Sequence, residues 1–171
     1  MKNRPIAFLV VAASMTPFTV HPCTSAVIGQ SASNSGCSML WKHRDTSHSE
    51  NYVDTVRSAD PRFDYVALFN SEDTLKQEAW AGVNRAGFAI MNTVAGNLPR
   101  NSRLWKDREG FLMSRALQSC VTVEDFRNLL DTLPRPLGVQ ANFGVIDKEG
   151  RGAYFETGDN GYEVFWVHDT A

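Results

Sequence analysis

The chain of 171 residues is about the length of one domain, and its 43% hydrophobic and 21% charged residues are typical of globular proteins. Its net charge of −2 gives no electrostatic reason to expect binding to nucleic acid or to an anionic membrane. After residue 22 no stretch is long and apolar enough to cross a bilayer, so we expect no integral membrane span.

Residues 1–22 have the pattern of an export signal. Lys2 and Arg4 form a basic start, the short apolar run "IAFLVVAA" follows, and small residues such as Ala13 and Ser14 come next. We expect this segment to be a signal peptide with a short pro-segment, and the protein to be secreted or periplasmic. Residues 23–171 are then the folded domain, and without the two basic residues the net charge of −2 becomes −4.

The first half of the domain is rich in strand-forming residues. We predict strands over residues 24–30, 37–44, 64–70, 76–83 and 88–93. The turn residues "SASNSG" join the first two strands, and "NRAG" joins the last two. Asn84 begins this second turn, where its tolerance of left-handed backbone explains its presence.

Two helices are predicted next, over residues 107–119 and 122–133, with Thr122 as an N-cap. Strands over 141–147, 152–158 and 162–167 follow, joined by the hairpin turns "DKEGRG" and "GDNG". The order of strands, helices and strands predicts an α+β fold. The polypeptide stops directly after a strand, where either an ordinary domain or a larger domain cut short could end.

Cys23 directly follows the export segment and is one of three cysteines. The odd number leaves at least one thiol of an exported chain without an intrachain partner. A disulfide to Cys120 and a lipid anchor are the alternatives to a reactive thiol, although Pro22 disfavours lipid attachment. Cys37 should face residue 31, which makes a bridge to Cys23 awkward. We expect Cys37 and Cys120 to be buried small hydrophobes or a mutual pair.

A hairpin symmetric about Asn34 would place Cys23 opposite Asp45, with Lys42 three positions before Asp45. If Cys23 becomes the first residue, its α-amino group, with an unperturbed pKa of roughly 7.7–8.0, can take the thiol proton and later return it to a leaving amine. Asp45 could orient that amine, and Lys42 could add positive charge beside the thiolate.

The stretch "CTSAVIGQSASNSGCSMLWKHRDT" resembles the opening of the cysteine N-terminal-nucleophile hydrolases. Within that class it resembles the choloylglycine hydrolases and, more closely, the penicillin acyltransferase-like peptidases. Cys23 matches the family's nucleophile, Asp45 its aspartate, and Lys42 a basic residue that is often arginine. The segment "GVNRAGFAIMNT" is similar to a family hairpin in which an asparagine, here Asn92, helps to build the oxyanion hole.

The resemblance implies a four-layer αββα fold, incomplete at its C-terminus, and an exported enzyme that cleaves linear amide C–N bonds through an acyl-enzyme. It implies no cofactor and no metal, autocatalytic removal of the pro-segment, and a small-molecule or peptide amide as substrate. The family's second asparagine and a later arginine fall beyond this chain. We therefore expect one open layer, oligomers and little activity from this chain alone.

Two questions stay open at this stage. The acyl group and the amine of the substrate are undetermined, as is the choice between hydrolysis and acyl transfer. The alternative function is a noncatalytic secreted α+β binding domain, in which Cys23 is structural or lipidated.

His43 and His48 lack the Cys or carboxylate partners of a metal site, so we expect exposed loop histidines.

Overall fold

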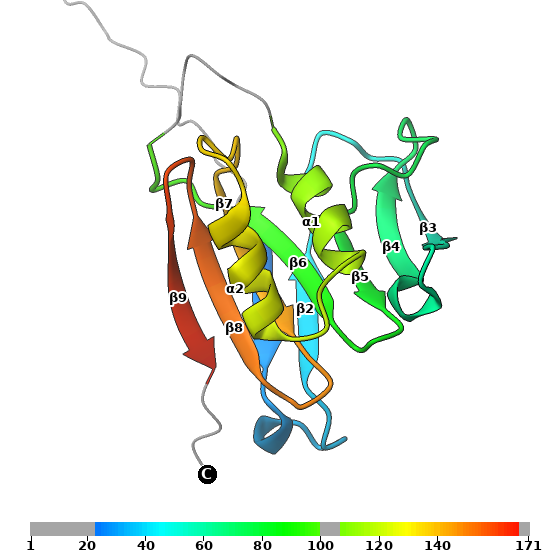
Figure 1. The fold of residues 1–171 in the computed structure, drawn as a ribbon, viewed down its shortest axis with the longest axis vertical. Coiled ribbons are helices and arrows are strands. Elements are labelled where there is room, and N and C mark those ends of the chain that lie inside the picture. Colours follow the sequence, from blue (N-terminus) through cyan, green and yellow to red (C-terminus); the bar gives the residue numbers. More distant parts are fainter. Residues whose placement is uncertain (1–22, 100–106, 168–171) are drawn as a thin grey trace, which may run out of the picture.

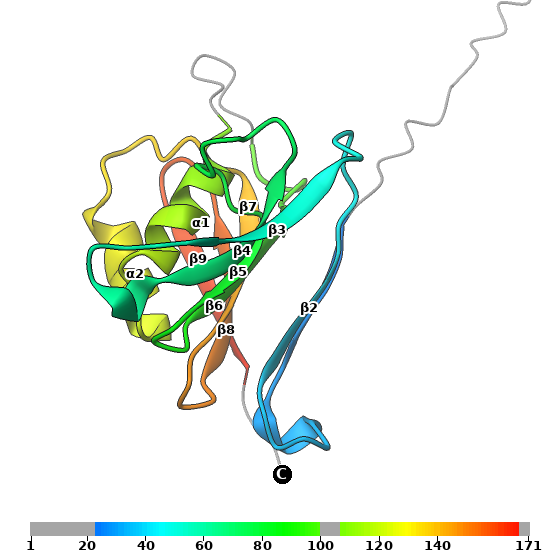
Figure 2. The ribbon, with the colours of Figure 1, turned by 90° about the vertical axis from the view of Figure 1, so that its right-hand side faces the viewer.

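A computed structural model describes residues 23–99 and 107–167. These residues form nine strands and two α-helices, arranged as one large sheet, a helical layer on one of its faces and a separate hairpin on the other (Figures 1 and 2). The predicted export segment lies outside the described residues.

The large sheet is an antiparallel meander in which the strand order follows the chain order. Its strands are β3 (Asn51–Val56), β4 (Tyr65–Asn70), β5 (Ala81–Asn84), β6 (Ala89–Val94), β7 (Ala141–Ile146), β8 (Gly152–Thr157) and β9 (Tyr162–Val167). The only long excursion joins β6 to β7, and it contains both α-helices. The connection that carries the helices therefore starts at the central strand β6 and ends at its neighbour β7.

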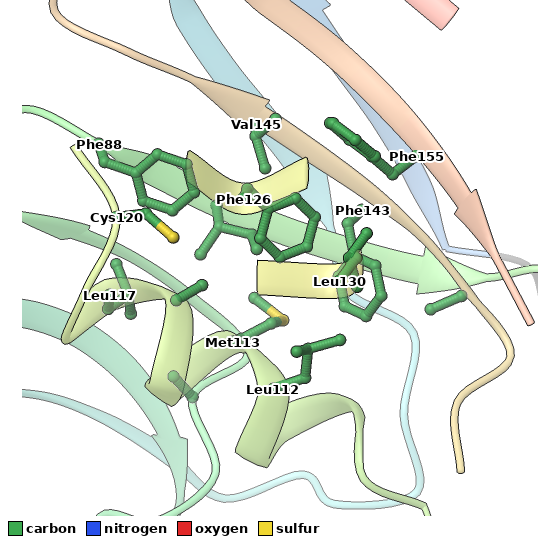
Figure 3. Close-up of a cluster of buried hydrophobic side chains, with 14 of the residues drawn as sticks. Phe88, Leu112, Met113, Leu117, Cys120, Phe126, Leu130, Phe143, Val145 and Phe155 are labelled. Atoms are coloured by element: carbon green, nitrogen blue, oxygen red, sulfur yellow. The ribbon is translucent and has the colours of Figure 1, made fainter. Parts of the chain in front are cut away.

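Helices α1 (Glu109–Leu117) and α2 (Val123–Thr132) cover one face of this sheet and close the hydrophobic core. Figure 3 shows Phe126 of α2 among aromatic rings of the sheet, with ring centroids 5.7 Å from Phe143 and 5.1 Å from Phe155. The Thr122 side chain accepts a hydrogen bond from the Asp125 backbone in a capping box, which confirms Thr122 as the N-cap.

The hairpin of β1 (Thr24–Ile28) and β2 (Met39–His43) lies on the sheet face opposite the helices (Figure 2). Val27 of the hairpin sits over two glycines of the sheet, where a Cβ on Gly152 would lie 2.9 Å from Val27 Cγ1 and one on Gly144 would lie 3.1 Å from Val27 Cγ2. Ser25 Oγ is also 3.0 Å from the hydroxyl of Tyr154. The missing glycine side chains thus let the hairpin approach the sheet closely.

Two strand predictions need correction. The edge strand β3 was missed because its exposed residues include Val53 as well as Asp54, so apolar and polar positions do not alternate cleanly. The strand expected over 76–83 begins only at Ala81. The segment before it is a loop, in which the backbone N–H of Glu78 donates to Asp73 Oδ2 at 2.7 Å and that of Ala79 to Ser114 Oγ at 2.9 Å.

The role expected for Asn84 in its turn is also wrong. The left-handed residue is Gly87, with φ of 92°, whereas Asn84 is not among the residues with positive φ. Asn84 is buried, and its side-chain amide donates to the carbonyls of Leu117 (2.9 Å) and Cys120 (2.8 Å). It ties the β5–β6 turn to the connection between the helices.

The α+β prediction is confirmed, and the described residues supply three of the four expected layers. These are the helical layer, the seven-stranded sheet and a second sheet that consists of the two-stranded hairpin. Within the described part of the chain, neither helix has the length and hydropathy needed to cross a membrane.

Candidate active site

The open end of the hairpin holds Cys23, just before β1. The strands pair with Thr24 opposite His43, so the register is one residue away from the predicted one, and its continuation places Cys23 opposite Arg44. A one-residue shift reverses which face each side chain takes. Cys23 nevertheless lies against Asp45, because its Sγ is 3.4 Å from both the backbone N–H and the backbone carbonyl oxygen of that residue.

Lys42 extends from β2 toward the large sheet. Its Nζ donates hydrogen bonds to the backbone carbonyl of Trp80, at 2.9 Å, and to Oδ1 of Asn92 on β6, at 2.7 Å. Asn92 Nδ2 in turn donates to Glu109 Oε2 at 2.7 Å, and Glu109 is the first residue of α1. This chain of hydrogen bonds connects all three layers of the fold.

The charges in this chain are largely removed from water. Burial lowers the pKa of Lys42 to about 8, an effect that the charges of Cys23 and Glu109 oppose and that of Arg44 reinforces. Burial, followed by the nearby charge of Asp107, raises the pKa of Glu109 to about 7. Both groups therefore titrate close to neutral pH, unlike ordinary lysine and glutamate side chains.

Arg44 adds a second cation that the sequence pattern did not single out. Its guanidinium lies 4.9 Å from the centre of the Trp80 ring and donates to Asn70 Oδ1 at 2.8 Å. Burial lowers its pKa, and the charge of Cys23 opposes this effect. Both cations, Lys42 and Arg44, thus interact electrostatically with Cys23.

The structure brings Cys23, Lys42 and Asn92 into one site, and places Asp45 beside Cys23 through its backbone. The catalytic roles expected for these four residues remain predictions. One N–H of the Asn92 amide is occupied by Glu109, so an oxyanion would be bound by the other.

Glu109 was missed because an acidic residue at the start of a helix is ordinary in sequence terms. Its place in the site comes from packing, which buries it to 8% exposure beside Asn92. Trp41 and Trp166 are 52% and 37% exposed, whereas Phe88 lies in the core.

All three cysteines are free thiols in the structure, so the disulfide pairings considered from the sequence are not formed. Cys120 is buried as expected, and burial raises its pKa to about 12. Cys37 is exposed, contrary to the expectation of a buried small hydrophobe. Cys23 is half-buried, between these two extremes.

Among residues 23–99 and 107–167, no three His, Cys, Asp or Glu side chains are grouped as metal ligands. His48 instead pairs with Glu72, with its Nδ1 2.9 Å from Glu72 Oε1, and His43 is exposed. The site offers a thiol, two cations, a carboxylate and amide groups.

Three solved structures are similar to this chain. A mutant conjugated bile acid hydrolase from Clostridium perfringens has a TM-score of 0.58 and 11% identity, over 86% of this chain and 51% of its own. An N-acylethanolamine-hydrolyzing acid amidase ortholog from Caenorhabditis elegans has a TM-score of 0.59 and 9% identity, over 85% and 64%. Penicillin V acylase from Agrobacterium tumefaciens has a TM-score of 0.41 and 14% identity, over 85% and 41%.

No protein-family model and no curated protein sequence matches this chain. The two higher TM-scores show that the chain has the fold of the N-terminal-nucleophile hydrolases. It spans 51% of the length of the bile acid hydrolase and 64% of that of the amidase.

Proposed function

We propose that this protein is an exported amidohydrolase that cleaves linear amide C–N bonds with Cys23 as its N-terminal nucleophile. The observation that carries the proposal is the meeting of Cys23, Lys42 and Asn92 in a fold that amide hydrolases share. Residues 1–22 direct export, and their removal makes Cys23 the first residue of the mature chain.

The reaction begins with proton transfer from the Cys23 thiol to its own α-amino group. The sulfur then attacks the amide carbonyl carbon and forms a tetrahedral intermediate with a negatively charged oxygen. Lys42 and Arg44 supply positive charge near the sulfur during the attack. Asp45, which lies against Cys23 in the folded chain, orients the amine.

The oxyanion is stabilised by the second N–H of the Asn92 amide and by backbone N–H groups. Collapse of the intermediate breaks the C–N bond, and the α-ammonium group returns the proton to the leaving amine. The product is a thioester of Cys23 with the acyl group. Attack by water then releases the acid and restores the thiol, whereas attack by an acceptor amine gives acyl transfer.

The first test is the substitution Cys23→Ala in the full-length protein. We expect the short pro-segment before Cys23 to stay attached and amide turnover to fall by roughly 1,000-fold or more, as for other nucleophile deletions. Intact mass reports the processing, and a glycine-conjugated bile acid, an N-acylethanolamine and penicillin V serve as amide probes. Cys37→Ala, which removes an exposed thiol, is the matched control.

Normal turnover by Cys23→Ala would contradict the proposal. A lipid adduct on Cys23, or a mature protein that retains the pro-segment before Cys23, would favour the alternative of a secreted binding domain. A mature chain that begins at Cys23 supports the enzyme.

A further inference from the structure

The carboxyl group of Glu109 has no assigned part in the reaction above, yet it is held in the candidate active site. Its residue is 8% exposed, and both carboxyl oxygens are engaged. Oε2 accepts from Asn92 Nδ2 at 2.7 Å, and Oε1 accepts from the backbone N–H of Gln140 at 3.3 Å. A buried carboxyl group that ends a hydrogen-bond chain from Lys42, a cation that interacts electrostatically with Cys23, is a candidate for a specific role.

The orientation of the Asn92 amide is the key to that role. An amide has a donor end and an acceptor end, and a carboxylate can only accept a hydrogen bond. Ionised Glu109 therefore holds Nδ2 toward itself, and this turns Oδ1 toward the ammonium of Lys42. The reversed amide would leave Nδ2 against the Lys42 cation and Oδ1 against the Glu109 anion, and both contacts would be repulsive.

We infer that Glu109 is a positioning residue for the candidate nucleophile: it fixes the Asn92 amide so that Lys42 remains charged beside Cys23. The inference rests on the proposed function for its meaning in catalysis. The hydrogen-bond chain itself exists whether or not the protein cleaves amides.

The arrangement has a defined pH window. Glu109, with a pKa of about 7, is mostly ionised above that pH, and Lys42, with a pKa of about 8, is mostly charged below that pH. The other charged groups that face these two are Asp107, which acts on Glu109, and Arg44 and Cys23, which act on Lys42. The complete charged chain is therefore most populated between about pH 7 and 8.

Alkylation of Cys23 measures this effect without any turnover. The full chain is treated with iodoacetamide from pH 6 to 9, and the rates at Cys23, Cys37 and Cys120 are read separately by peptide mass spectrometry. The exposed Cys37 is an internal standard for intrinsic thiol reactivity, and the buried Cys120 reports unfolding. The variant is Glu109→Gln, which keeps the size of the side chain and removes its charge.

In the wild-type protein we expect the ratio of the Cys23 rate to the Cys37 rate to rise as Glu109 ionises near pH 7 and to fall as Lys42 deprotonates near pH 8. In Glu109→Gln the rise near pH 7 should disappear, and the ratio at pH 7.5 should fall by roughly threefold or more because a cation favours the reactive thiolate. Glu124→Gln, a neutralised carboxylate on α2 that pairs with Arg127 at the surface, should match the wild type.

Lys42→Arg provides the rescue test, because arginine stays charged throughout this pH range. In that background Glu109→Gln should no longer change the ratio. An unchanged pH profile in Glu109→Gln, or an equal effect of that substitution in the Lys42→Arg background, overturns the inference.

If Glu109→Gln exposes Cys120 and so unfolds the protein, Lys42→Arg alone decides. It should make the fall above pH 8 smaller than in the wild type, and a fall of undiminished size overturns the inference. Failure of the proposed function is recognised separately, by normal amide turnover in Cys23→Ala.

Discussion

Glu109 and Lys42 each carry a charge in a place where little water remains. Hydrogen bonds from Asn92 and Gln140 and the charge of Lys42 favour ionised Glu109, but burial outweighs them and leaves its pKa at about 7, against an ordinary 4.5. Such a group opposes folding when it is charged. Buried ionisable groups of this kind are common at functional sites, where they lower the stability of the protein.

The burial of Glu109 predicts how stability depends on pH. Because the folded-state pKa of Glu109 is raised, its stabilising contribution is complete below about pH 4.5 and is lost as the pH rises through about 7. Glu109→Gln cannot ionise, so the variant should gain on the wild type over this range, by on the order of 2 kcal/mol in unfolding free energy at pH 8.

Urea denaturation of both proteins at pH 4.5, 6 and 8 checks this prediction. Titrations of groups away from the site are shared and cancel in the difference, and the measurements at pH 4.5 and 6 lie below the pKa of Lys42, about 8. A difference that does not change with pH would show that Glu109 titrates as an ordinary exposed carboxyl group.

At the scale of elements, the site depends on where the β1–β2 hairpin lies. The hairpin carries Lys42, with Cys23 and Arg44 at its open end, whereas Asn92 belongs to the large sheet, so the geometry of the candidate site is set by the contact between the two layers. Val27 makes that contact over Gly144 and Gly152, where a Cβ would fall within 3.1 Å and 2.9 Å of its methyl groups. Displacement of the hairpin would separate Lys42 from Asn92.

Gly152→Ala should therefore destabilise the protein by about 1–3 kcal/mol through overpacking. Adding Val27→Ala should recover part of this loss, because it removes the Cγ1 atom that the new methyl group meets. Gly161→Ala is the control, since nothing lies within 4 Å of a Cβ there. Thermal or urea unfolding of the single and double variants measures the coupling, and strictly additive losses would show that the hairpin does not rest on this contact.

At the scale of the whole molecule, the hairpin is a sheet with one covered face. Its outward face includes Met39 and Trp41, which are 41% and 52% exposed, and these pair across the strands with Ile28 and Ala26. Within the described residues neither edge of the hairpin is paired with a further strand. Exposed apolar surface and open strand edges both favour association.

We therefore expect the purified chain to elute from size-exclusion chromatography as oligomers, increasingly so at higher concentration. Trp41→Lys should raise the monomer fraction, because it places a charge in the centre of the apolar face. Leu75→Lys is the control, since Leu75 is even more exposed, at 76%, but lies in a loop of the other layer. A compact wild-type monomer at all concentrations would contradict this expectation.

Local features of the fold could be read from the amino-acid sequence. The helix predicted over 122–133 is observed at Val123–Thr132 with Thr122 as its cap, because capping depends on residues three positions apart. The closeness of Cys23 to Asp45 was also predicted, since a short hairpin brings these residues together without distant contacts. Even there the register was wrong by one residue, because the turn contains a short 3-10 segment, Gln30–Ala32, that shifts the pairing.

The remainder of the site was decided by tertiary packing. Lys42 and Asn92 are 50 positions apart, and Asn92 and Glu109 are 17 apart, so no local pattern predicts their hydrogen bonds. The sequence alone determined the α+β order of elements and the position of the thiol at the first strand, since periodicity and turn chemistry act over a few residues. The burial of Glu109 and the approach of Lys42 to the thiol depended on how the three layers packed and excluded water. Both are properties of the folded surroundings of a group, which a local sequence pattern does not contain.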